Sequence, residues 1–138
     1  MNPYARLQQQ SMPSWTRIDI LLALYDGAIE RCEQALAALD RRDETAARKL
    51  VDKARLIVMG LASGVVSDGD PVTTDILRLY EYVLQALERG GAEDVRGALN
   101  VLRILREGFQ KIRPEAAELE RAGAIPPVAA ASSVQALA

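Results

Sequence analysis

The chain has 138 residues, of which 49% are hydrophobic and 26% are charged, a composition typical of one soluble domain with a sizeable core. Its 17 Lys and Arg residues are balanced by 19 Asp and Glu residues, so the net charge of −2 offers no basic excess for binding nucleic acid. Histidine is absent and Cys32 is the only cysteine, which excludes an internal disulfide, zinc sites and histidine-based catalytic groups. We therefore expect no catalytic residue, metal or cofactor.

Aromatic residues make up only 4% of the chain, and Ala, Leu, Ile and Val supply the apolar content beside many Arg and Glu residues. This mixture favours helices over sheets. No apolar run approaches the ~20 residues of a membrane span, and the first residues contain no apolar segment like that of a signal peptide. The sequence therefore predicts an all-α protein that stays in the cytoplasm and does not insert into a membrane.

The first 15 residues form a separate segment, residues 1–15. They are polar, contain two prolines and show no sustained period, so we expect an irregular arm anchored on the protein by Tyr4 and Leu7. A frayed terminus is the alternative. The arm interpretation places these side chains near Ile20 and Leu24, where the first helix carries surplus apolar surface. It also predicts that removing the arm strengthens partner binding.

The first predicted helix begins after Thr16, which can cap it together with Asp19 at the spacing of a capping box. Apolar residues then recur at helical spacing, with acidic residues on the opposite side. This apolar stripe consists of Ile18, Leu21, Leu22, Tyr25, Ile29, Cys32, Leu36 and Leu39. Four successive charged residues from Asp40 to Asp43 end the helix.

Turn signals separate the second helix from the third. The second helix ends near Gly64, where we expect a left-handed cap. In the Ser-Asp-Gly-Asp-Pro segment that follows, Asp70 can cap a third helix that has Pro71 in its first turn and ends at Gly90. The two stripes consist of Ala47, Leu50, Val51, Ala54, Ile57, Val58 and Leu61, then Ile76, Leu79, Tyr80, Val83 and Leu87.

The fourth helix begins near Glu93 and contains Pro114, which we expect to end or kink it. Residues 115–121 then have the length of a short fifth helix, and the Ala-rich residues 123–138 form a disordered tail that is dispensable for folding and binding. The stripe of the fourth helix consists of Val95, Ala98, Leu99, Leu102, Leu105, Phe109 and Ile112. Short turns between long helices predict an antiparallel up-and-down four-helix bundle over residues 16–122.

Several apolar residues lie beside these stripes. The candidates for partner binding among them are Ile20, Leu24, Leu56, Met59, Leu77, Leu84, Val101 and Ile104. One interpretation is that they only widen the core, as the residues of bundle helices often do. The other is that they line grooves that accept apolar side chains of a partner. Met59 suits both, because Met fills gaps in cores and also serves adaptable binding surfaces.

Charged residues give weaker signals. Asp26 and Glu30 form a like-charge pair that a basic partner or a neighbouring Arg would stabilise, so Asp26 is a further binding candidate beside the alternative of a solvated face. Arg103 and Arg106 share one face of the fourth helix near Glu107, where we expect them to be solvated. Because charges fall mainly outside the stripes, the sequence predicts no polar pocket between the helices and no enzymatic activity.

Residues 24–29, Leu-Tyr-Asp-Gly-Ala-Ile, resemble a stretch in the first helix of the FliS family of flagellar export chaperones, with six identical residues in a row. Residues 2–4, Asn-Pro-Tyr, resemble the start of many members, and residues 79–82, Leu-Tyr-Glu-Tyr, resemble the family's Leu-Tyr-x-Tyr in the third helix. The entry into the first helix departs from the family pattern, and Phe109 stands near where many members carry Trp. These departures concern partner specificity.

This resemblance implies a cytoplasmic chaperone that binds the C-terminal segment of flagellin, prevents premature polymerisation and delivers flagellin to the flagellar type III export apparatus. We expect the chain to act as a monomer or a weak homodimer. A helical adaptor or structural bundle that self-associates or binds other export components is the alternative function. A small helical enzyme is a third hypothesis.

Overall fold

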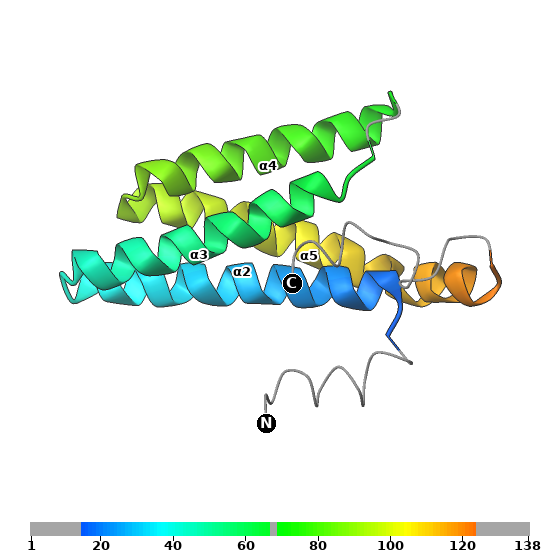
Figure 1. Ribbon diagram of the computed structural model, residues 1–138, viewed down its shortest axis with the longest axis horizontal. Coiled ribbons are helices and arrows are strands. Elements are labelled where there is room, and N and C mark those ends of the chain that lie inside the picture. Colours follow the sequence, from blue (N-terminus) through cyan, green and yellow to red (C-terminus); the bar gives the residue numbers. More distant parts are fainter. Residues whose placement is uncertain (1–14, 67–68, 124–138) are drawn as a thin grey trace.

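The computed structural model describes residues 15–66 and 69–123. Over these residues the chain forms four helices, α2 (Arg17–Asp40), α3 (Glu44–Ser63), α4 (Pro71–Arg89) and α5 (Ala92–Arg121), and no strand. Each helix packs against the next one in the chain, and α2 also packs against α5 (Figure 1). The predicted antiparallel up-and-down four-helix bundle is therefore confirmed. The predicted arm and tail lie outside the described residues except for Trp15 and Gly123.

The helices begin and end mostly where local sequence signals predict. Asp19 accepts hydrogen bonds from the backbone N–H (3.1 Å) and the hydroxyl (3.0 Å) of Thr16, the residue before α2. Asp70 accepts a hydrogen bond from the N–H of Val72 at the start of α4, which has proline at its first position. Gly90 ends α4 in the left-handed conformation, with φ of 73°. The left-handed cap expected at Gly64 is wrong, because its φ is −81°.

The predicted fifth helix is not separate. Helix α5 runs without interruption through Pro114 to Arg121, so residues 115–121 are its last turns. A proline inside a helix costs about 3 kcal/mol, because it removes one N–H donor and crowds the preceding turn. Contacts with the start of α2 offset this cost. Ala117 packs against Ile18 and Leu22, and the Glu120 carboxylate accepts a hydrogen bond from the N–H of Arg17 at 3.1 Å.

Two tyrosines meet at the centre of the core. The hydroxyl groups of Tyr25 on α2 and Tyr80 on α4 form a buried hydrogen bond with each other. The ring of Tyr25 also stacks on Phe109 of α5, with ring centroids 5.6 Å apart. Burial raises the pKa of both phenols above the usual value, so both stay protonated. Side chains from three helices thus interact at one point of the core.

Most residues predicted at the centres of the stripes are core residues. Those that the structure buries are Tyr25, Ile29, Leu61, Tyr80, Val83 and Leu102. Ile57 and Leu105 are partly buried against the same core. The core therefore follows the helical period of the sequence over most of its length.

Ion pairs join α2 to α5 along the outside of this core. Asp19 and Asp26 on α2 bind Arg113 and Arg106 on α5, and Glu33 binds Arg103 at 3.2 Å. Asp19, Asp26 and Glu33 are spaced by seven residues, while their partners run backwards along α5. This order fixes the antiparallel register of the two helices. Burial opposes the ionisation of Asp19, yet hydrogen bonds from Thr16 and Arg113 lower the pKa of its carboxyl group below the usual value.

Candidate functional site

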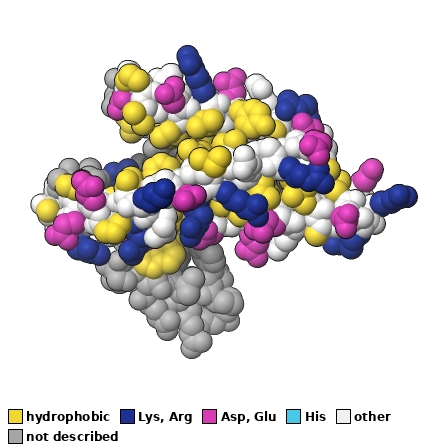
Figure 2. Space-filling model, turned by 180° about the vertical axis from the view of Figure 1, so that it is seen from behind, with side chains coloured by type: hydrophobic (Ala, Val, Ile, Leu, Met, Phe, Trp, Pro, Cys, Tyr) yellow, Lys and Arg dark blue, Asp and Glu magenta, His cyan; other side chains and the backbone are white. Residues whose placement is uncertain are grey.

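Exposed apolar side chains gather where α4 faces α5. We call Leu79, Tyr82, Val101, Ile104 and Ile112 the apolar band. Ile104 is 61% exposed, Leu79, Tyr82 and Ile112 are also exposed, and Val101 is partly buried against the core. Seen from behind, hydrophobic side chains lie between α4 above and the middle of the molecule, with charged side chains below them (Figure 2). An exposed apolar surface with a charged rim is typical of a site that binds another protein.

Two glycines on α5 flank the band residues of that helix. Gly97, Val101, Ile104 and Gly108 recur at three- and four-residue spacing, so they share one face of the helix. A Cβ atom at Gly97 would lie 2.5 Å from the hydroxyl oxygen of Tyr82, which shows that this face of α5 points toward α4. At Gly108 the same atom would meet nothing within 4 Å. Among the described residues, none covers the surface around Gly108.

The band is exposed because α4 and α5 diverge. The two helices are close at the Gly90 turn, but the start of α4 and the end of α5 point apart (Figure 1). Leu79 and Ile112, which the stripes place in the core, are 38% and 48% exposed. Their assignment to the core was wrong. Of the band, the predicted candidates include Val101 and Ile104 but not Leu79, Tyr82 or Ile112, since helical period alone does not show where two helices part.

The predicted candidates on α3 and the adjacent side of α4 differ in exposure. Leu56 is 66% and Met59 is 51% exposed, whereas Leu77 and Leu84 are partly buried and pack against the core. For Leu77 and Leu84 the structure thus shows the wider core that was the alternative interpretation. Leu56 and Met59 are surface residues of α3.

The candidates on α2 are mostly inside the protein. Ile20 is only 9% exposed, and Leu24 is partly buried against the core. A partner does not reach the side chain of Ile20 in this conformation, so its placement on an open surface is corrected. Tyr4 and Leu7, the expected anchors of the arm, lie outside the described residues.

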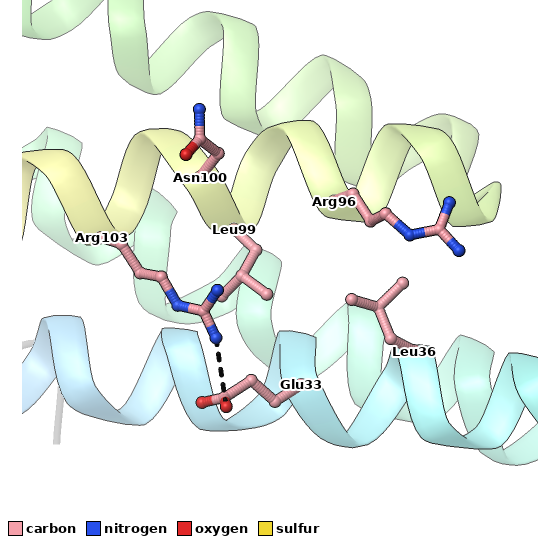
Figure 3. Close-up of a pocket in the computed structure, with 6 residues that line it drawn as sticks. All are labelled: Glu33, Leu36, Arg96, Leu99, Asn100 and Arg103. Atoms are coloured by element: carbon pink, nitrogen blue, oxygen red, sulfur yellow. Dashed lines mark ion pairs between the residues drawn. The ribbon is translucent and has the colours of Figure 1, made fainter.

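The polar face of α2 and α5 has its charges paired within the chain. Asp26 binds Arg106, so the group that stabilises this carboxylate is an arginine of the same chain and not one of a partner. Arg103 binds Glu33. Both arginines lie on an exposed face, as predicted, and each also forms an ion pair with α2. A shallow pocket of about 430 Å³ lies beside the second pair, with Arg103 reaching from α5 to Glu33 while Arg96 points away (Figure 3). Arg96 binds Glu93 on its own helix. This pocket has no unpaired charged group to hold a substrate.

The described residues offer little for catalysis. Groups of His, Cys, Asp and Glu that could hold a metal ion are absent from them. Burial, with a further contribution from Glu33, raises the pKa of the Cys32 thiol to about 11, so this thiol is protonated and unreactive at neutral pH. No helix of the described chain is long and apolar enough to span a membrane. What the arrangement can do chemically is cover an apolar surface of another polypeptide.

Comparison with protein families gives one match. The model of the family described as "Flagellar protein FliS" matches residues 1–116, which include α2, α3, α4 and most of α5. Comparisons with curated proteins and with solved structures found no match.

Proposed function

The chain belongs to the FliS family of flagellar proteins, which are export chaperones, and from this premise we propose that it binds the C-terminal segment of flagellin in the cytoplasm. It keeps this segment from polymerising early and delivers flagellin to the flagellar type III export apparatus. The apolar band between α4 and α5 is the observation that supports this function. The binding surface consists of Leu79, Tyr82, Val101, Ile104 and Ile112.

A disordered amphipathic segment is the kind of partner that such a band covers. Apolar side chains of the segment would lie on Ile104 and Ile112, and the open surface at Gly108 would let its backbone approach α5 closely. Folding of a segment on binding typically buries ~1,000–3,000 Å² and costs ~2–5 kcal/mol in ordering. The band is only part of such an interface, so Asp26 and the partly buried Leu24 on α2 are further candidates for contact with the segment.

The decisive experiment is a titration of the full chain with flagellin, with and without the last ~40 flagellin residues, a length set by an interface of that size. We expect binding of intact flagellin and loss of binding without its C-terminal segment. Equal affinity for both forms of flagellin would contradict the proposal. A chain that binds only other export components would instead favour the adaptor function.

Two substitutions test the place of the site. Ile104→Ala should lower flagellin affinity by ~1–2 kcal/mol, the cost of losing a typical apolar anchor. Leu56→Ala is the matched control, because Leu56 is an equally exposed aliphatic residue on α3, which does not adjoin α5. Both side chains are exposed, so the urea midpoint should stay nearly unchanged in both variants. If Ile104→Ala binds flagellin with normal affinity, the apolar band is not part of the binding site.

A further inference from the structure

A second exposed surface lies on α3, away from the apolar band. Leu56 and Met59 are about one turn apart and exposed, beside the core stripe of the same helix that contains Val51 and Val58. Helix α3 packs against α2 and α4, while α5 lies diagonally across the bundle. A partner on this surface therefore leaves the band on α5 free.

The charges around these two residues are mostly positive. Helix α3 carries Arg48, Lys49, Lys53 and Arg55 against Glu44 and Asp52, although the whole chain has a net charge of −2. Asp52 binds Arg48 and Arg55 at 3.6 and 3.8 Å. Lys49 and Lys53 form no ion pair with any described residue. The surface thus combines two apolar side chains with two free ammonium groups.

Arg55 adds a second indication. Its Nε atom is buried and, among residues 15–66 and 69–123, has no hydrogen-bond partner, while its side chain as a whole is 31% exposed. A buried donor without a partner is unfavourable. A carboxylate arriving at this surface would give the Nε atom a partner once the side chain turns outward.

We propose that the α3 patch, defined as Lys49, Lys53, Arg55, Leu56 and Met59, binds an acidic amphipathic helix of another protein. The apolar face of that helix would lie on Leu56 and Met59, and its carboxylates would pair with the basic side chains. The termini of this chain do not have this chemistry, because residues 1–14 and 124–138 contain no Asp or Glu. The patch spans about 15 Å along α3 at 1.5 Å per residue, which suits a partner helix of about three turns.

The interaction goes beyond flagellin binding. Because α3 packs mainly against α2 and α4, the partner on the α3 patch and the segment on the apolar band would occupy separate surfaces. The chain would hold both at once, as an adaptor between an apolar cargo segment and an acidic partner.

A synthetic peptide provides the test. The probe is a fluorescent amphipathic peptide of about 15 residues, with Leu on one helical face and Glu on its flanks, and the control peptide carries Lys in place of each Glu. Fluorescence anisotropy with the full chain should show binding of the acidic peptide alone, and the affinity should fall as salt is raised. Leu56→Ala and Lys53→Glu should each weaken binding by about fivefold or more.

Matched variants keep the result specific. Ile104→Ala on the band and Lys111→Glu on the exposed face of α5 should leave the peptide affinity unchanged. Circular dichroism and urea midpoints confirm that each variant is folded. The peptide assay contains no flagellin, so the flagellin proposal can fail while this one holds.

Four results would overturn the proposal. Equal binding of the acidic and basic peptides would show an apolar surface without charge selection. Loss of peptide binding in Ile104→Ala, with Leu56→Ala unaffected, would place the peptide on the band. If sedimentation shows that the chain self-associates and Leu56→Ala abolishes this, the patch binds a second copy of the chain. A loss of flagellin affinity in Leu56→Ala would show that flagellin itself binds the α3 patch.

Discussion

The Tyr25–Tyr80 hydrogen bond is the polar interaction that lies deepest in the bundle. Each hydroxyl group is removed from water and has the other as its partner. A buried polar group that loses its partner costs more than the bond itself contributes, whereas removing both partners can be nearly neutral. The two tyrosines should therefore behave as a unit.

Tyr80→Phe should lower the free energy of unfolding by ~1–3 kcal/mol, because the Tyr25 hydroxyl stays buried without a partner. Tyr25→Phe should have a similar effect, and the double variant should cost less than the two single variants together. Urea unfolding of the three variants measures this. Strictly additive costs would show that the two hydroxyl groups do not depend on each other.

Gly108 separates folding from binding at a single residue. Gly108→Ala should raise the free energy of unfolding by about 1 kcal/mol, since alanine is the better helix former and its Cβ atom meets nothing within 4 Å. The same methyl group should weaken flagellin binding, because it fills the space where the segment approaches α5. Urea unfolding and a flagellin titration on one sample measure both effects. A variant that is stabilised and binds normally would exclude close approach at Gly108.

At the scale of the helix, the end of α5 shows that tertiary contacts can override a local signal. Pro114 predicts a helix end, and yet the helix continues because Arg113, Ala117 and Glu120 all contact the start of α2. The cost of the proline remains in the folded state. Removing it should thus stabilise the protein.

Pro114→Ala should raise the urea midpoint. It restores an N–H group inside the helix and removes a clash, which together cost about 3 kcal/mol. The unfolded chain gains conformational freedom without the proline, which reduces this stabilisation by up to ~1 kcal/mol. Pro71→Ala is the control, because Pro71 is the first residue of α4, where proline fits without loss. A lower urea midpoint in Pro114→Ala would mean that the proline is needed for the contacts between the end of α5 and the start of α2.

Local signals and helical period predicted much of this structure. Asp70 and Gly90 act on neighbouring backbone groups, so their roles at the ends of α4 can be read from a few residues. Tyr80 and Leu102 follow the helical period and are buried as expected. The pairing of Asp26 with Arg106 joins residues 80 positions apart, and no local pattern specifies it.

The candidate site was predicted less well, for a geometric reason. Ile104 and Leu56 lie off the stripes and are exposed, as their positions on the helices indicate. Leu79 and Ile112 lie on the stripes and are nevertheless exposed. Their exposure depends on the divergence of α4 and α5, a property of the assembled bundle and not of either helix alone (Figure 1).

At the scale of the whole molecule, the described helices end at Arg121, before the predicted tail. Truncation after Ala122 should leave the melting temperature and flagellin affinity unchanged, because the removed residues have small side chains and two prolines. Truncation after Arg113 is the contrasting variant. It deletes Ala117 and Glu120, which contact the start of α2, and should therefore lower the melting temperature. Thermal unfolding distinguishes the two. A large loss of stability on truncation after Ala122 would show that the tail packs on the bundle.

The pairing of α2 with α5 also bears on how the protein is made. The first described helix is completed by the last one, through ion pairs between residues such as Asp19 and Arg113 that are 94 positions apart. During synthesis, α2 leaves the ribosome long before α5 does, so the part of its apolar face that α5 covers stays exposed until the last helix follows. The bundle is therefore complete only when its final helix is released from the ribosome.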